Sequence, residues 1–164
     1  MHRNQLIYYF LAFSFLTIYI VSFITENTLF SLKKNSNVKE YKNVSTQEYE
    51  DAVVTVALYV EGLRVGSVPI LTQAFHRDAT ISGFDDDKLL HGPIKNFYDF
   101  VEKNGPAPNI KTRIDVLSIT PTTAILRVDM ENDAVGANYT DFHTLIKLEG
   151  TWYIITKVYH RYEG

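Results

Sequence analysis

Hydrophobic positions along the 164-residue chain follow three successive patterns, each typical of a different kind of structure. Residues 6–25 form an uncharged run of about the length that crosses a bilayer as a helix. Residues 26–44 are polar and rich in lysine, as in a linker. From residue 45 onward, apolar residues recur first at helical spacing and then at strand spacing. The sequence therefore predicts a signal or membrane anchor over 1–25, a linker over 26–44 and one domain over 45–164.

The N-terminal run favours an uncleaved anchor over a cleaved signal peptide, because it is long and no small-residue cleavage site follows it. Arg3 precedes the run and several lysines follow it, so the flanking charges leave its orientation open. We expect the domain to be membrane-anchored or exported to the periplasm or the extracellular space.

The first part of the domain has the pattern of three helices. Ser45 and Glu48 have the spacing of a capping box, and apolar residues then recur every three or four positions until Gly66. A short second helix is predicted over 68–75, with a proline in its first turn. A third is predicted over 93–103, where a Gly-Pro pair follows and ends it.

Strand patterns fill the rest of the domain. A short hairpin is expected over 79–90, with its turn at 85–88. A solvated turn is favoured over a calcium loop for the three aspartates in it. Four longer strands follow, at 111–120, 122–132, 138–148 and 151–162. Helices first and strands afterwards predict an α+β fold with the helices on one sheet face.

Composition narrows the class of partner. The chain is 46% hydrophobic and 13% aromatic with a net charge of −3, which excludes a disordered acidic tail and argues against a nucleic-acid binder. It has no cysteine, which excludes a disulfide, a thiolate nucleophile and a cysteine-bound metal. We expect a small molecule or another protein as partner, with no cofactor and no nucleic acid.

The turn at Glu149-Gly150 has the length of a tight hairpin and sets the pairing of the last two strands. If the pairing continues without interruption, His143 lies opposite Thr156 and Asp141 lies opposite Val158. One face then holds Tyr139, Asp141, His143, Leu145, Trp152, Ile154, Val158 and His160, joined by Ala124, Leu126, Val128 and Met130 if a four-residue loop closes the preceding hairpin. A mostly apolar face with a few ionisable groups predicts the wall of a ligand pocket.

Asp141 and His143 are the candidate catalytic residues. An apolar cavity raises the pKa of a carboxylate, and an imidazole exchanges protons near neutral pH, so the pair could abstract a proton beside a carbonyl or assist loss of water. Tyr139, Tyr59 or His160 would donate to the developing oxyanion. Alternatively, Asp141 only hydrogen-bonds His143 or Tyr59 and ties the sheet to a helix.

The other candidate sites are less well supported by the pattern. The predicted ligand-binding residues are Tyr59, Tyr139, Trp152 and His160. No metal is expected, because Asp141, His143 and His160 are not part of a dense cluster of ligands. His76 and Asp78 form a second ionisable pair, for which a structural role beside the next strand is favoured over catalysis.

The opposite sheet face mixes apolar and charged side chains, as dimer interfaces often do. By the same pairing it holds Phe142, Thr144, Ile146, Tyr153, Ile155, Lys157, Tyr159 and Arg161. We therefore expect a homodimer built sheet to sheet.

Six segments, in this order and spacing, carry a family resemblance: ALYVEGLRVG at 57–66, AFHRDAT at 74–80, HGPI at 91–94, NGPAP at 104–108, YTDFHTL at 139–145 and WYIITKVYH at 152–160. Together they resemble the lumazine-binding branch of the nuclear transport factor 2-like superfamily. The resemblance implies a cone-shaped α+β fold, in which a curved antiparallel sheet wraps around the N-terminal helices and encloses a pocket. It also implies relatives that include ketosteroid isomerases, dehydratases and non-catalytic proteins.

Function is left open between two classes by this resemblance, because the same fold serves both. The first hypothesis is a domain that binds a small, partly apolar ligand without chemistry. The second is an isomerase or dehydratase that uses the Asp141 and His143 pair.

Overall fold

The computed structural model describes residues 44–85 and 87–162. The predicted signal or anchor over 1–25 and nearly all of the predicted linker lie outside these residues, so the anchored or exported location stays a prediction. Within the described part, no helix is long and apolar enough to cross a membrane.

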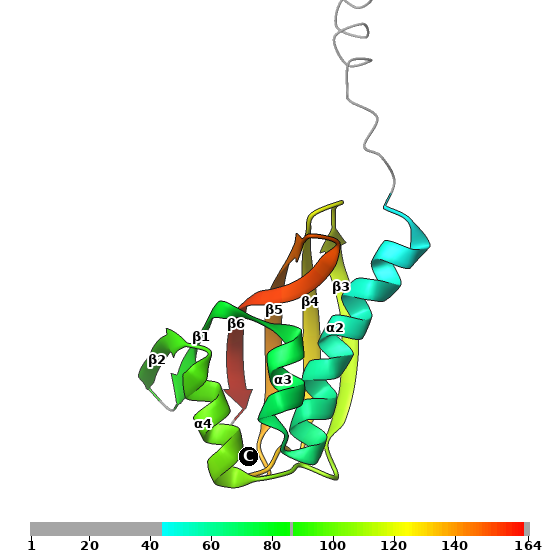
Figure 1. Ribbon diagram of the computed structural model, residues 1–164. Coiled ribbons are helices and arrows are strands. Elements are labelled where there is room, and N and C mark those ends of the chain that lie inside the picture. Colours follow the sequence, from blue (N-terminus) through cyan, green and yellow to red (C-terminus); the bar gives the residue numbers. More distant parts are fainter. Residues whose placement is uncertain (1–43, 86, 163–164) are drawn as a thin grey trace, which may run out of the picture. The chain divides into compact units, whose positions relative to one another are not determined.

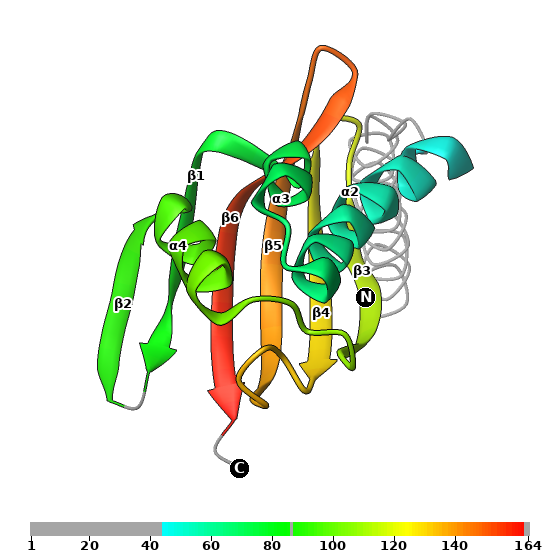
Figure 2. The same ribbon diagram turned by 60° about the horizontal axis from the view of Figure 1, so that its bottom comes forward.

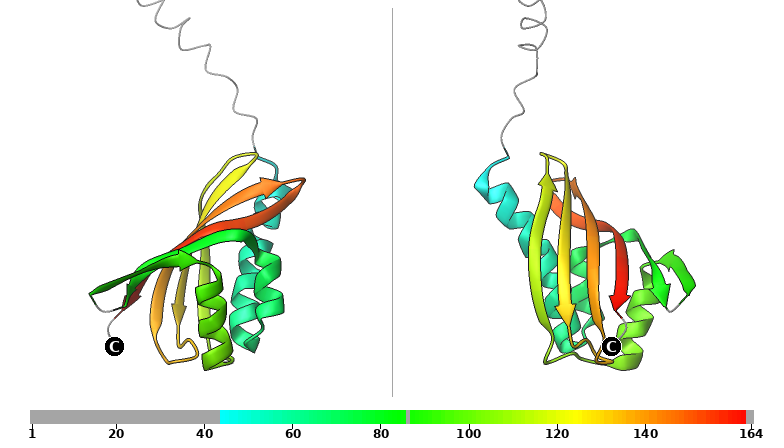
Figure 3. Two further views of the ribbon diagram at one scale, coloured as in Figure 1. Left: turned by 60° about the vertical axis from the view of Figure 1, so that its left-hand side comes forward. Right: turned by 180° about the vertical axis from the view of Figure 1, so that it is seen from behind.

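The described part folds as a curved six-stranded sheet with its helices on one face (Figure 1; Figure 3, right). The helices are α2 (Thr46–Val65), α3 (Val68–Ala74) and α4 (Lys95–Asn104). The strands are β1 (Phe75–Asp85), β2 (Lys88–Pro93), β3 (Lys111–Ile119), β4 (Thr123–Glu131), β5 (Asn138–Leu148) and β6 (Thr151–Tyr162). The predicted elements and the predicted α+β class are confirmed.

The strand order is β2-β1-β6-β5-β4-β3 (Figure 2). Hairpins join β1 to β2 and link β3 through β6 in sequence, and these pairs are antiparallel. The curved sheet expected from the sequence is antiparallel at every pair of neighbouring strands except one, where β1 and β6 pair in parallel. These two strands are far apart in the chain, so no tight turn forces them to run in opposite directions.

Helix α2 begins and ends where the sequence predicts. The Ser45 hydroxyl accepts a hydrogen bond from the Glu48 N–H at 3.2 Å, and Gly66 ends the helix with a left-handed φ of 66°. The Glu48 side chain departs from the capping-box prediction, because its carboxylate accepts from the Lys147 ammonium on β5 at 2.5 Å. The first turn of α2 is thereby tied to the sheet.

The core lies between the helices and the concave face of the sheet. Strand β4 turns Ala124, Leu126, Val128 and Met130 toward the helices, as the alternation predicts, and all four are buried. Leu71 of α3 is fully buried beside α2 as well. Burial of this apolar face holds the helices in place, because it removes apolar surface from water.

The hairpin of β5 and β6 contains the main departure from the predicted register. Leu148 lies opposite Thr151, which confirms the two-residue turn. Leu145 then lies opposite Ile154, but Thr144 lies opposite Thr156, so Ile155 is the extra residue of a β-bulge.

A bulge exchanges the two faces of every residue beyond it. Lys157 therefore lies opposite His143, where an unbroken ladder would place Thr156. Lys157 is buried, whereas Val158 and His160 are exposed. The prediction that Val158 and His160 face the pocket while Lys157, Tyr159 and Arg161 face outward is wrong.

Candidate functional site

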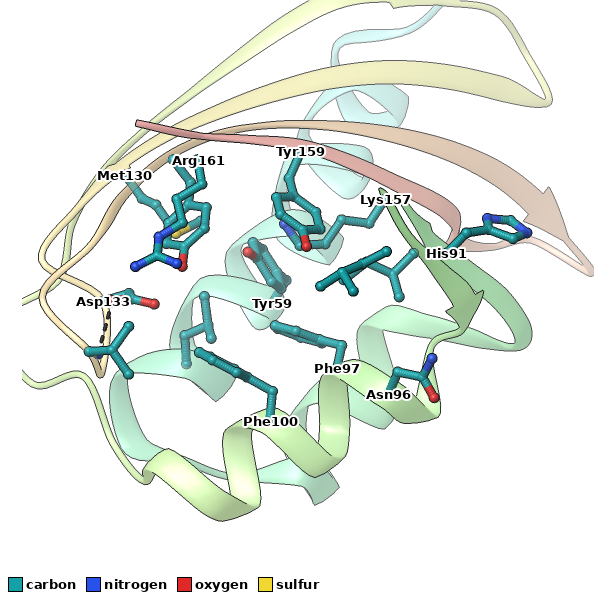
Figure 4. A pocket seen from close by; sticks show the side chains of 15 residues that line it. Tyr59, His91, Asn96, Phe97, Phe100, Met130, Asp133, Lys157, Tyr159 and Arg161 are labelled. Atoms are coloured by element: carbon teal, nitrogen blue, oxygen red, sulfur yellow. Dashed lines mark hydrogen bonds between the residues drawn. The ribbon is translucent and has the colours of Figure 1, made fainter. Parts of the chain in front are cut away.

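A cavity of about 290 Å³ lies on the concave side of the sheet, between β6, α2 and α4 (Figure 4). Its lining is mainly apolar and aromatic, with polar groups from β6, β2 and the loop between β4 and β5. The lining residues are Tyr59, Leu63, Ile81, Leu90, His91, Asn96, Phe97, Phe100, Met130, Asp133, Val135, Tyr139, Lys157, Tyr159 and Arg161. This make-up is typical of a site for a small, partly apolar molecule.

Asp141 joins the sheet to the pocket lining. Its carboxylate is fully buried, and Oδ2 accepts a hydrogen bond of 2.5 Å from the Tyr59 hydroxyl on α2. Its Oδ1 forms an ion pair with the Lys157 ammonium. The predicted hydrogen bond between Asp141 and Tyr59 is therefore confirmed, and the carboxylate has a cationic partner that the sequence did not predict.

The Lys157 ammonium sits among aromatic rings on the pocket wall. It lies 5.0 Å from the ring centre of Tyr159, 5.5 Å from that of Tyr59 and 5.8 Å from that of Phe97. These are distances at which a cation is attracted to an aromatic face. Its side chain is only 5% exposed, so the carboxylate and the rings take the place of water around the charge.

Burial and charge act in opposite directions on these groups. Burial alone would raise the pKa of Asp141, but the Lys157 charge and, after it, His143 lower that pKa to about 2. Burial lowers the pKa of Lys157, against the opposing charge of Asp141. Burial and the Asp141 charge both raise the pKa of Tyr59. At neutral pH the site therefore holds a carboxylate and a neutral phenol, with the Lys157 nitrogen paired to the carboxylate.

Tyr159 reaches the pocket because a glycine stands beside it on β1. Gly83 lies opposite Tyr159 in the parallel pair, and a Cβ on Gly83 would come within 2.4 Å of the Tyr159 ring. No side chain larger than hydrogen can occupy this position while the ring stays in place. The glycine thus allows the ring to lie over β1 and close one side of the Lys157 environment.

The two ends of the pocket differ in chemistry (Figure 4). Arg161 and Asp133 lie at one end, near Met130. Asp133 is held by its own loop, because its carboxylate accepts the N–H groups of Val135 and Ala137 at 3.0 and 2.8 Å. His91 and Asn96 lie at the other end. A ligand with a polar group at each end and an apolar middle would complement this arrangement.

His143 lies in the core behind the lining. Its ring is fully buried, and its centre lies 4.7 Å from that of Tyr59. Nε2 is 3.7 Å from Asp141 Oδ2, which is too long for a hydrogen bond, and within the described residues neither ring nitrogen has a hydrogen-bond partner. Burial lowers the pKa of His143, so the ring is neutral at neutral pH. His143 is therefore not part of the pocket lining.

The predicted ligand-binding residues divide into two pairs. Tyr59 and Tyr139 are on the lining. Trp152 is not, because it is buried before the bulge, under α2, where the Thr55 hydroxyl donates to its carbonyl oxygen. His160 is exposed on the convex side, with its ring 4.8 Å from that of Tyr162. The predicted positions of Trp152 and His160 in the pocket are wrong.

The remaining ionisable candidates from the sequence, His160, His76 and Asp78, do not line the pocket. His160 is on the other sheet face from Asp141 and His143, and the described residues contain no group of three or more His, Cys, Asp or Glu that could hold a metal. His76 and Asp78 lie at the start of β1, where the Asp78 N–H donates to His76 Nδ1 at 3.2 Å. This local contact agrees with the structural role favoured for that pair.

Lys157, Tyr159 and Arg161 are lining residues that sequence reasoning placed on the opposite sheet face. Both faces of β6 carry apolar side chains, so the alternation does not show where the bulge lies. A lysine in a strand is also most often a surface residue. The short distance between the glycine of β1 and the end of β6 becomes apparent only in the fold.

We expect Asp141→Asn to destabilise the chain by about 3–5 kcal/mol, because it leaves the Lys157 cation buried without a counter-ion. Denaturant unfolding at neutral pH measures the loss. The control is Asp78→Asn, an exposed carboxylate on β1 whose removal should change stability by less than about 0.5 kcal/mol. Equal effects of the two substitutions would contradict the buried pair.

Comparison with known proteins shows relatives over most of the domain. An aldolase named FrzH from Cladobotryum sp is 35% identical over 121 residues, which cover 74% of this chain and 97% of that protein. A solved NTF2-like protein of unknown function from Shewanella baltica is 35% identical, with a TM-score of 0.70, covering 74% of this chain and all of that one. Another, from Methylobacillus flagellatus, is 36% identical over 74% of this chain and 97% of that one, also with a TM-score of 0.70.

More distant structures share the fold alone. One is a ketosteroid isomerase-like protein from Erwinia carotovora, which is 16% identical with a TM-score of 0.55 and covers 73% of this chain and all of that one. The family described as "Putative lumazine-binding" matches residues 47–160, from the first turn of α2 to near the end of β6. The chain therefore belongs to this lumazine-binding family of the NTF2-like superfamily.

Proposed function

We propose that the pocket binds a small, partly apolar carbonyl compound and promotes loss of a proton from the carbon beside the carbonyl. The observation that carries the proposal is the cluster on the pocket wall, where the Lys157 ammonium and the Tyr59 hydroxyl both contact the buried Asp141 carboxylate. These three groups provide a cation, a hydroxyl and a carboxylate beside the apolar middle of the cavity.

A carbonyl oxygen near Lys157 would gain more from the cation than it would in water. The ammonium is held in a site of low exposure, where electrostatic interactions are stronger than in solvent. Negative charge grows on that oxygen when the neighbouring carbon loses its proton, and a fixed cation stabilises the charge as it develops. Tyr59 offers its oxygen to the departing proton while its own proton points to Asp141.

The name of one relative fits the same reaction step, loss of a proton beside a carbonyl. FrzH is named an aldolase, and aldol chemistry begins with proton loss beside a carbonyl. The isomerase or dehydratase that the sequence suggested as an alternative would use the same first step. The proposal therefore rests on the shared step and not on a particular product.

Binding without chemistry is the second candidate. It is favoured by the state of Asp141, because both carboxylate oxygens have partners and the pKa of about 2 makes the group a weak base. In that case Lys157 and Arg161 would only orient a ligand that carries a carbonyl or an anionic oxygen.

A panel of aryl ketones such as 4-phenyl-2-butanone and 1-indanone tests both candidates. Thermal shift of the full chain reports binding, and NMR in D₂O reports exchange of the protons beside the carbonyl. We expect at least one ketone to stabilise the chain and to exchange at least about 10²-fold faster than in buffer. Lys157→Met should abolish the exchange, because it removes the cation.

Lys147→Met is the matched control, since Lys147 is also largely buried and paired with a carboxylate but is not on the pocket lining. It should keep the exchange. Stabilisation without exchange would favour binding alone. Absence of both for every ketone would overturn the proposal.

The convex face of the sheet supports a further proposal, a homodimer. Ile125, Phe142 and Val158 are exposed there by 43%, 43% and 45%, and Phe142 lies opposite Val158. Phe142→Asp should convert the protein to a monomer in analytical ultracentrifugation, whereas Leu89→Asp, an exposed residue of β2, should not. A wild-type chain that sediments as a monomer at high concentration would exclude the dimer.

A further inference from the structure

We propose that Lys157 reacts covalently with its ligand, forming an iminium with a ketone or aldehyde in the pocket. This inference rests on the proposed carbonyl ligand and adds to it the bond that is formed. It comes from the position of one amine, the chemistry of its neighbours and the charge balance of the reaction.

The first argument is geometric. The bulge at Ile155 turns Lys157 inward, and its side chain is 5% exposed while remaining part of the pocket lining. Rings of Tyr59, Phe97 and Tyr159 surround the ammonium at 5.0 to 5.8 Å. A carbonyl compound that fills this cavity therefore has the amine beside it, in a place that surface lysines do not provide.

The second argument is the balance of charge. The ammonium and the carbonyl combine to give a protonated iminium and one water, as the C=O bond is replaced by C=N and two ammonium protons leave with the oxygen. The free amine is the species that attacks, but the positive charge is on the same nitrogen before and after the condensation. Asp141 therefore remains its counter-ion, and no buried charge is left without a partner at this step.

The third argument concerns the proton that leaves next. When the C–H bond beside the iminium breaks, its electron pair forms a C=C bond and the iminium becomes a neutral enamine. The Tyr59 oxygen accepts the proton while the Tyr59 hydroxyl passes its own proton to Asp141 Oδ2 at 2.5 Å. An ion pair thereby becomes a neutral pair, which is favourable in a site that excludes water.

Covalent chemistry also removes the weakness of Asp141 as a base. The Lys157 cation opposes the effect of burial and keeps the Asp141 carboxyl ionised. In the enamine that cation is gone and the largest effect opposing burial is lost, so the carboxylate takes a proton more readily. A lysine that stayed a permanent cation would leave Asp141 a poor proton acceptor.

The amine itself is suited to this reaction. Burial lowers the pKa of Lys157, which increases the fraction of free amine available for attack on a carbonyl. Asp141 opposes this effect but does not cancel it. The direction is the one expected of a lysine that forms Schiff bases.

The test uses 1-phenyl-1,3-butanedione with the full chain. Condensation of this diketone with an amine releases water and gives a stable enaminone with a new ultraviolet absorption. We expect a mass gain of one probe less one water per chain, mapped to the peptide that contains Lys157. Lys157→Arg, which keeps the positive charge, should lose both the mass gain and the absorption, whereas Lys147→Arg should keep them.

Separate measurements distinguish failure of this inference from failure of the proposed function. If aryl ketones bind and exchange their protons in a Lys157-dependent way but the diketone does not label Lys157, the covalent step is wrong and the function stands. Labelling spread evenly over exposed lysines would likewise overturn the covalent step. If no ketone binds and no label forms, both proposals fail.

Discussion

The ion pair between Asp141 and Lys157 is the interaction on which the candidate site depends. It is buried, and each partner makes the charge of the other tolerable inside the domain. The pair also links the sheet to two helices, because the Tyr59 hydroxyl on α2 donates to Asp141 and Lys157 lies 5.8 Å from the centre of the Phe97 ring on α4. α2, α4 and the sheet thus meet at a buried polar cluster, and the pocket lies beside it.

A single extra residue makes this pair possible. Without the bulge at Ile155, the position opposite His143 would be occupied by Thr156, and Lys157 would point to solvent. Gly83 provides a second local condition, because the Tyr159 ring needs the space that a side chain on β1 would fill. The bulge and the glycine act together, since they position adjacent inward residues of β6 at the place where β6 pairs with β1.

Much of the fold and part of the site could be predicted from the sequence. Capping at Ser45, the left-handed Gly66 and the turn at Glu149-Gly150 depend on local backbone chemistry, and the inward alternation of β4 depends on strand periodicity. The same patterns predict Asp141 and Tyr59 as site residues. They do not predict Lys157, because both faces of β6 are partly apolar and the alternation therefore does not reveal the bulge. The sequence wrongly predicts Trp152 in the pocket, because an inward-facing aromatic residue gives the same pattern whether it lines a cavity or fills the core.

The titration of Asp141 tests this account most directly. Its carboxyl ¹³C chemical shift can be followed by NMR in the wild type and in Lys157→Met. With Lys157 present we expect a pKa of about 2. Without the cation, burial is no longer opposed by its largest counter-effect, so the pKa should rise from about 2 toward or beyond the ordinary value of about 3.9. An ordinary pKa in both proteins would show that Asp141 is neither buried nor paired, and would contradict the central claim.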